Sequence, residues 1–90
     1  MYSRHALVRM QQRGIPQEIV RYLTRFGARA YDHRGARIRY FDRASRRRLL
    51  QEKGPVGMRD MEKYLNAYAV EAVDGGVVTV GHLYKRVWRH

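Results

Sequence analysis

The segment from residue 65 to residue 84 constrains the fold of this chain most strongly, because it reads as an antiparallel β-hairpin. Two runs, residues 65–73 and 77–84, flank the sequence Asp74-Gly75-Gly76. An aspartate followed by two glycines is typical of a tight hairpin turn, and β-branched residues dominate the second run, as they do in strands. The sequence therefore predicts that the chain contains an antiparallel sheet.

Residues 3–27 predict two helices in succession. Ser3 is placed to cap the first helix, and Gly14 is placed to end it in the left-handed conformation. Pro16 suits the first position of the second helix, and Gly27 suits its end. The second helix would bury a stripe of apolar side chains at helical spacing: Ile15, Ile19, Tyr22, Leu23 and Phe26.

The middle of the chain predicts two short strands, then a third helix. The strands cover residues 28–33 and 36–42 and meet across Arg34-Gly35. Asp42 would cap a short helix over residues 43–53, which Gly54-Pro55 would end before a linker and a last helical turn near residues 59–64. The predicted order is α-α-β-β-α-β-β. It indicates a single α+β domain over residues 1–90, with helices packed on one face of a four-stranded antiparallel sheet.

Charge is the strongest global signal for function. Lysine and arginine number 19 against 8 acidic residues, which gives a formal net charge of +11. Most of the excess is arginine, whose planar guanidinium suits phosphate contacts and stacking on bases. A polyanionic partner is expected: nucleic acid first, with RNA ahead of DNA, then an acidic protein, and an anionic membrane surface last. The sequence has no cysteine, no signal-peptide pattern and no apolar run of membrane-spanning length, so a cytoplasmic location is the default expectation.

The first helix gathers polar groups on one side. His5, Arg9, Gln12 and Arg13 share a face at helical spacing, which is suitable for holding a phosphate and moving a proton. The same pattern also fits an ordinary solvated helix face. His82, in the last strand, is the second candidate for proton transfer, so that one histidine would act as base and the other as acid. The catalytic candidates are therefore His5, Arg9, Arg13 and His82.

A further set of residues is expected to contact nucleic acid rather than to react. Two of these residues lie in the second strand, three in the arginine run of the third helix, and four, of which two are basic, in the last strand and tail. They are Arg37, Arg39, Arg46, Arg47, Arg48, Thr79, Tyr84, Lys85 and Arg86. A solvated helix face is the alternative interpretation of the arginine run. Acidic residues are scattered and no metal-binding motif occurs, so neither a metal site nor a cofactor is expected.

The helix motif resembles that of a bacterial family of small domains of unknown function. His5-Ala6-x-x-Arg9-Met10-x-x-Arg13-Gly14-Ile15 matches an H-A-x-x-R-M-x-x-R-G-I signature, and residues 73–80 resemble its closing hairpin. Relatives continue with G-H-R-x-K-R, whereas this chain has Leu83 in place of that arginine. The family is similar to the RelE- and barnase-like (BECR) ribonuclease fold. The resemblance implies an endoribonuclease toxin paired with an antitoxin, with His5, Arg9, Arg13 and Thr79 at matching positions.

Three functions follow as hypotheses. The first is a metal-independent endoribonuclease toxin that leaves a 2′,3′-cyclic phosphate. The second is a non-catalytic nucleic-acid-binding module that uses the arginine run as its main contact. The third is a basic interaction protein that docks an acidic partner, such as an antitoxin.

Overall fold

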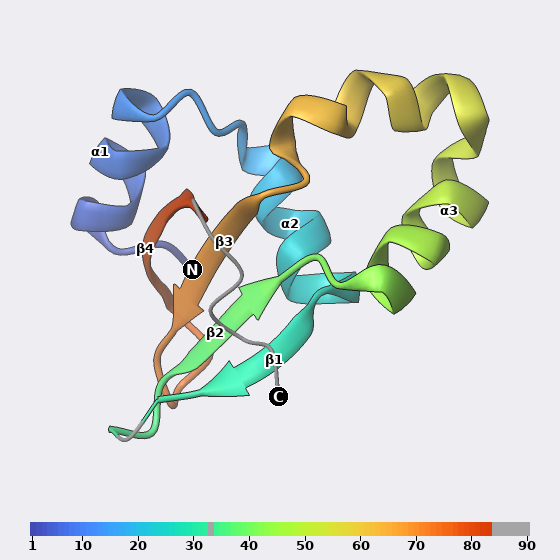
Figure 1. The fold of residues 1–90 in the computed structure, drawn as a ribbon. Coiled ribbons are helices and arrows are strands. Elements are labelled where there is room, and N and C mark those ends of the chain that lie inside the picture. Colours follow the sequence, from blue (N-terminus) through green and yellow to red (C-terminus); the bar gives the residue numbers. More distant parts are fainter. Residues whose placement is uncertain (33, 84–90) are drawn as a thin grey trace.

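The computed structural model describes residues 1–32 and 34–83 and confirms the predicted α+β class. Figure 1 shows the elements in the predicted order. They are α1 (Arg4–Gln12), α2 (Gln17–Phe26), β1 (Ala28–Tyr31), β2 (Arg37–Tyr40), α3 (Arg43–Met61), a 3₁₀ turn η1 (Glu62–Tyr64), β3 (Ala67–Glu71) and β4 (Val77–His82). β2 ends earlier than predicted, because the chain passes at Asp42 into the cap of α3, and β3 begins later than predicted, after the turn η1.

The four strands form one antiparallel sheet in the order β1-β2-β3-β4. An aspartate fixes each of the two hairpin turns: Asp32 Oδ1 accepts a hydrogen bond from the Ala36 amide at 2.9 Å, and Asp74 Oδ1 accepts one from the Gly76 amide at 2.9 Å. The β3–β4 ladder shifts register between Val70 and Glu71. Both predicted hairpins are therefore confirmed.

Local chemistry sets the ends of the first two helices. The Ser3 hydroxyl accepts the Ala6 amide at 3.0 Å, and Gly14 adopts a positive φ of 63°, as predicted. Pro16 caps α2 with an extended backbone instead of occupying its first helical position. Gly27 ends α2 without a left-handed turn. A Cβ there would lie against the Leu23 carbonyl and 3.1 Å from the Tyr40 carbonyl oxygen, so only glycine lets the helix end approach β2 this closely.

The predicted linker after Gly54 is wrong, because the chain continues as helix. Gly54 has non-helical angles (φ 75°, ψ 172°) and kinks α3. Pro55 follows the kink and begins the second arm of α3, residues 55–61, where the fixed φ of proline suits the first turn of a helix. Met58 and Met61 on that arm pack against the core, and this packing holds the segment helical. In Figure 1, α3 bends sharply at the side of the sheet.

The core lies between the sheet and the two N-terminal helices. α1 lies along β4, and α2 lies over β3 and β2 and also contacts α3. Ala67 and Ala69 on β3 are fully buried, and their small side chains let the helices approach the sheet. The larger buried side chains of the core are Met10, Ile15, Ile19, Val20, Leu23, Phe41, Leu49, Met61, Val77 and Val80.

Residues 1–3 lie beside the start of β4, which the sequence did not predict. Tyr2 bridges Val77 in parallel, the Ser3 amide donates to the Val77 carbonyl at 2.8 Å, and the Val77 amide donates to the Met1 carbonyl at 2.8 Å. The Ser3 hydroxyl also donates to the Val78 carbonyl at 3.1 Å. These bonds occupy the outer edge of β4 where the strand begins.

Candidate nucleic-acid interface

The polar face of α1 is a connected group. Arg9 Nε donates to His5 Nε2 at 3.3 Å, and Arg9 Nη1 donates to Gln12 Oε1 at 3.1 Å. His5 and Gln12 are exposed, while Arg9 is half-buried. Because His5 Nε2 accepts this bond, the imidazole proton sits on Nδ1 in this arrangement. The helix therefore brings together an imidazole, a guanidinium and an amide, as its spacing predicted.

Arg13 and His82 form a second group where α1 meets β4. Arg13 Nη1 donates to the Val80 carbonyl at 3.2 Å, and His82 Nε2 lies 3.2 Å from the Arg13 carbonyl oxygen. Gly81 makes room for this crossing. A Cβ there would meet the Arg13 guanidinium and lie 2.9 Å from the Tyr68 hydroxyl. Arg13 thus ties the end of α1 to β4 while its residue remains exposed overall.

The two candidate histidines have separate neighbours. His5 contacts Arg9, whereas His82 contacts the backbone of Arg13. The eight residues from His5 to Arg13 correspond to about 12 Å of helix rise. A base and an acid that act on one phosphate must both lie within about 3 Å of its reacting atoms. The two imidazoles would therefore need at least one of these contacts to rearrange before they could share a phosphate.

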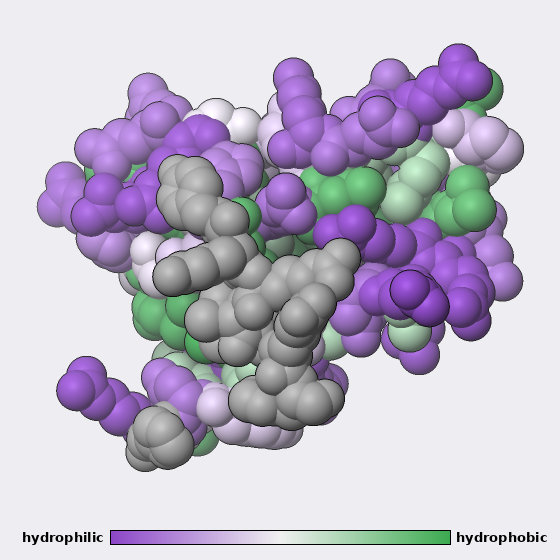
Figure 2. All heavy atoms as spheres, in the orientation of Figure 1, coloured by the Kyte–Doolittle hydropathy of each residue, from purple (hydrophilic) through white to green (hydrophobic). Residues whose placement is uncertain are grey.

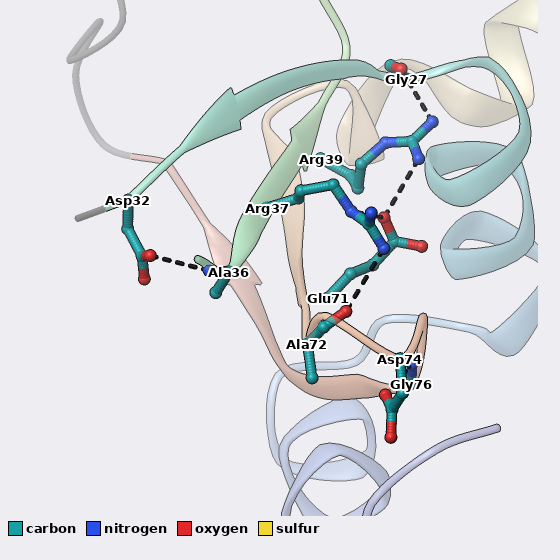
Figure 3. Close-up of polar contacts among 9 residues, drawn as sticks. All are labelled: Gly27, Asp32, Ala36, Arg37, Arg39, Glu71, Ala72, Asp74 and Gly76. Atoms are coloured by element: carbon teal, nitrogen blue, oxygen red, sulfur yellow. Dashed lines mark hydrogen bonds and ion pairs between the residues drawn. The ribbon is translucent and has the colours of Figure 1, made fainter. Parts of the chain in front are cut away.

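The two β2 arginines share one carboxylate (Figure 3). Arg39 is 5% exposed; its Nη1 donates to Glu71 Oε1 at 3.1 Å and its Nη2 donates to the Gly27 carbonyl at 2.9 Å. Arg37 Nε lies 3.4 Å from the same carboxylate oxygen, and Arg37 Nη2 donates to the Ala72 carbonyl at 3.3 Å. Arg39 therefore links β2, β3 and the end of α2 and is not on the exposed surface, whereas Arg37 is partly exposed.

The arginine run on α3 divides into one bonded and two exposed side chains. Arg46 donates to the carbonyls of Phe41 and Leu65 at 3.2 and 3.1 Å and so ties α3 to the chain before β3. Arg47 and Arg48 are exposed. In Figure 2, hydrophilic residues gather over α3 and over α1 on the viewed face. The exposed part of the run is therefore available to a ligand, while Arg46 has a structural role.

The Asp42 cap of α3 is confirmed. Its Oδ1 accepts both the amide and the hydroxyl of Ser45. Partial burial raises the pKa of this carboxyl, but the hydrogen bonds from Ser45 and the charge of Arg48 outweigh it and leave the pKa below its usual value. Asp42 is therefore a stable anion that begins α3 directly after β2.

The remaining predicted contacts are spread over the molecule. Thr79 is half-buried on β4, on the opposite face of the strand from Val80. Tyr84, Lys85 and Arg86 lie outside the described residues. A shallow surface hollow is lined by Arg59, Asp60, Glu62 and Lys63, none of which is a predicted site residue.

Two residues of β1, Arg29 and Tyr31, belong to this basic surface and are not among the predicted site residues. Arg29 pairs with Arg39 across the β1–β2 ladder, and Tyr31 pairs with Arg37, so all four side chains share the helix-covered face of the sheet. Arg29 is exposed and Tyr31 is 69% exposed. The alternation of β1 as A-R-A-Y was the signal that could have found them, because both larger side chains fall on one face.

Ion pairing leaves most of the positive charge uncompensated. Within residues 1–32 and 34–83, the ion pairs join Glu71 to Arg37 and Arg39, and Glu18 to Lys53. The described residues include no cluster of three or more metal-ligating side chains. Nor does any helix of that part of the chain combine the length and apolar character required to cross a bilayer.

Comparison of this chain with protein-family models, with curated proteins and with solved structures finds no match. The assignment of a functional surface therefore depends on the geometry and charge described above.

Proposed function

We propose that this protein binds RNA through its exposed arginines. One observation carries the proposal: among the described residues, exposed arginines from every helix and from β1 make no ion pair with an acidic side chain, while the buried Glu71 is already shared by two arginines. The exposed set is Arg4, Arg13, Arg21, Arg25, Arg29, Arg34, Arg43, Arg47, Arg48 and Arg59.

Such an excess of guanidinium groups favours a polyanion on physical grounds. Arginines on one surface repel one another, and phosphates relieve that repulsion while releasing counterions into solution. Arg47 and Arg48 are adjacent on α3 and both exposed, so they are the simplest place to measure this contribution.

Fluorescence anisotropy of a labelled RNA tests the proposal. The logarithm of the binding constant is expected to fall linearly with the logarithm of salt concentration, with a slope of about −0.7 per phosphate contacted on a single strand. Arg47→Gln with Arg48→Gln should make that slope shallower by about 1.4, while Gln51→Ala on the same helix should not change it. Absence of binding at low salt, or binding that salt does not weaken, would overturn the proposal.

A second candidate, an endoribonuclease toxin, is favoured by the contact between Arg9 and His5. A guanidinium beside an imidazole on an exposed helix pairs a phosphate-binding group with a proton-transfer group. Once Arg9 turns its guanidinium from His5 Nε2 to the phosphate, His5 Nε2 would take the proton from a ribose 2′-hydroxyl, and Arg9 would stabilise the phosphate as the 2′-oxygen attacks it. The bond from phosphorus to the 5′-oxygen would break as the bond to the 2′-oxygen forms, and the leaving 5′-oxygen would take a proton from solvent water. The product would be a 2′,3′-cyclic phosphate formed without a metal.

Incubation with RNA and ribosomes separates the two candidates. Toxin activity predicts cleavage that His5→Ala and Arg9→Ala abolish, with Gln11→Ala, at an exposed position of the same helix outside the polar group, as the control. It also predicts arrest of growth on overexpression. Cleavage by the wild type no greater than that by His5→Ala would exclude it. If RNA is neither bound nor cleaved while an acidic antitoxin-like protein binds, the domain is an interaction protein instead.

A further inference from the structure

We propose that the β1 side of the helix-covered face binds a single-stranded polynucleotide, with a base stacked on Tyr31 and phosphates held by Arg29 and Arg37. This proposal rests on the RNA-binding function above and assigns a site to it. It uses two residues, Arg29 and Tyr31, that no sequence motif indicated.

The strand register brings these side chains together. The ladder sets Tyr31 opposite Arg37 and Arg29 opposite Arg39, and Arg37 is in turn opposite Glu71 on β3. Directly paired residues on one face of an antiparallel sheet have Cβ atoms about 5 Å apart. Two neighbouring cross-strand rows therefore carry one aromatic ring and three guanidinium groups.

Coverage by the helices leaves this surface accessible. α2 lies over β3 and β2, where Ala69 and Arg39 are buried. On β1 the same face carries exposed Arg29 and a Tyr31 ring that is 69% exposed. An exposed tyrosine of this kind offers a flat surface on which any base can stack.

The charge of the site calls for an anion. Glu71 is the acid that pairs with these arginines, and it is shared between Arg37 and Arg39. The Arg37 side chain is 28% exposed, so part of its guanidinium can meet a phosphate while its Nε stays 3.4 Å from the Glu71 carboxylate. Arg29 adds a further cation at the open margin, so the rows keep an excess of positive charge beside the exposed ring. A strand of phosphates and bases matches both features, because phosphates pair with guanidinium groups and bases stack on the ring.

Anisotropy with fluorescent oligouridylate and oligodeoxythymidylate of about eight nucleotides tests the site. Tyr31→Ala should weaken binding about 5- to 150-fold without changing the salt slope, whereas Tyr31→Phe should bind as the wild type does. Arg29→Gln should make the slope shallower by about 0.7, and Lys63→Gln, which removes one exposed positive charge from η1 outside the set of exposed arginines, should leave it unaltered. A preference for one sugar identifies RNA or DNA as the ligand, and either supports the site.

A duplex RNA provides the matched ligand control. Its bases are stacked inside the helix and cannot stack on Tyr31, so Tyr31→Ala should not weaken duplex binding. Steeply salt-dependent binding by the wild type that Tyr31→Ala and Arg29→Gln both leave unchanged would overturn this site and leave the RNA-binding function intact. Failure of the wild type to bind either oligonucleotide would overturn both.

Discussion

Replacement of Glu71 by glutamine is the most demanding test of the arginine pairing. Glu71 is 6% exposed, and one of its oxygens lies 3.1 Å from Arg39 Nη1 and 3.4 Å from Arg37 Nε. The amide of glutamine keeps the shape of the side chain but removes its charge, so two guanidinium groups would remain with no compensating anion between them. The Arg39 side chain is 6% exposed and also donates to the Gly27 carbonyl at the end of α2, so it stays buried when the carboxylate is removed.

The exposure of the two arginines sets how much free energy of unfolding Glu71→Gln should lose. Removing one partner of a buried ion pair costs about 3–5 kcal/mol. The Arg37 side chain is 28% exposed and can turn toward water, so we expect the lower end, about 3 kcal/mol in the free energy of unfolding. With an m-value of about 1–2 kcal/mol per molar urea, the unfolding midpoint should fall by about 1.5–3 M.

Urea unfolding followed by far-ultraviolet circular dichroism measures this change. Glu62→Gln makes the same substitution at an exposed position and should cost no more than about 0.5 kcal/mol. The double variant Arg39→Met with Glu71→Met should lose less free energy of unfolding than Glu71→Gln alone, because the double variant removes the buried charge together with its partner. A loss below about 1 kcal/mol for Glu71→Gln would refute the reasoning, since it would mean that the two arginines do not depend on this carboxylate.

Two further predictions concern positions whose role is structural. Gly81→Ala should displace the Arg13 guanidinium and the Tyr68 ring, because the new Cβ would lie too close to both. The free energy of unfolding should fall by about 1–3 kcal/mol in the same urea assay. An unchanged unfolding midpoint would show that these two side chains move aside without cost. Asp42→Ala should cost about 0.5–2 kcal/mol at neutral pH through loss of the α3 cap. Because the folded-state pKa of Asp42 lies below its usual 3.8, this contribution is present above about pH 4 and disappears as the pH falls through the folded pKa, so wild type and variant should converge in stability there.

Local signals in the sequence predicted the fold well. Ser3, Gly14 and Asp42 act at the helix ends as expected, and the aspartate–glycine turn at residues 74–76 sets the β3–β4 hairpin. Those signals lie within a few residues of the structure they specify. The segment after Gly54 was the exception, because its helix depends on packing of Met58 and Met61 against a core formed by distant parts of the chain.

The site was harder to predict for the same reason. The spacing on α1 correctly grouped His5 with Arg9, since both lie on one helix. Arg39, in contrast, is buried and paired with Glu71. Glu71 is 32 residues away in sequence and becomes the neighbour of Arg39 only through the register of β2 and β3. Residues that look alike in the sequence therefore divide into structural arginines, such as Arg39 and Arg46, and exposed ones.

The pairing of residues 1–3 with the start of β4 has a consequence for how the chain folds during translation. The Ser3 hydroxyl bonds to a carbonyl 75 residues later. At about 5–20 residues per second, a ribosome needs roughly 4 to 15 seconds to synthesise the intervening chain. During that interval Ala6 and Met10 have no strand to pack against, and a nine-residue helix such as α1 is only marginally stable without packing. Burial of α1 therefore has to wait until β4 has been synthesised, and an mRNA that delays translation of β4 would prolong the exposure of this segment to chaperones and proteases.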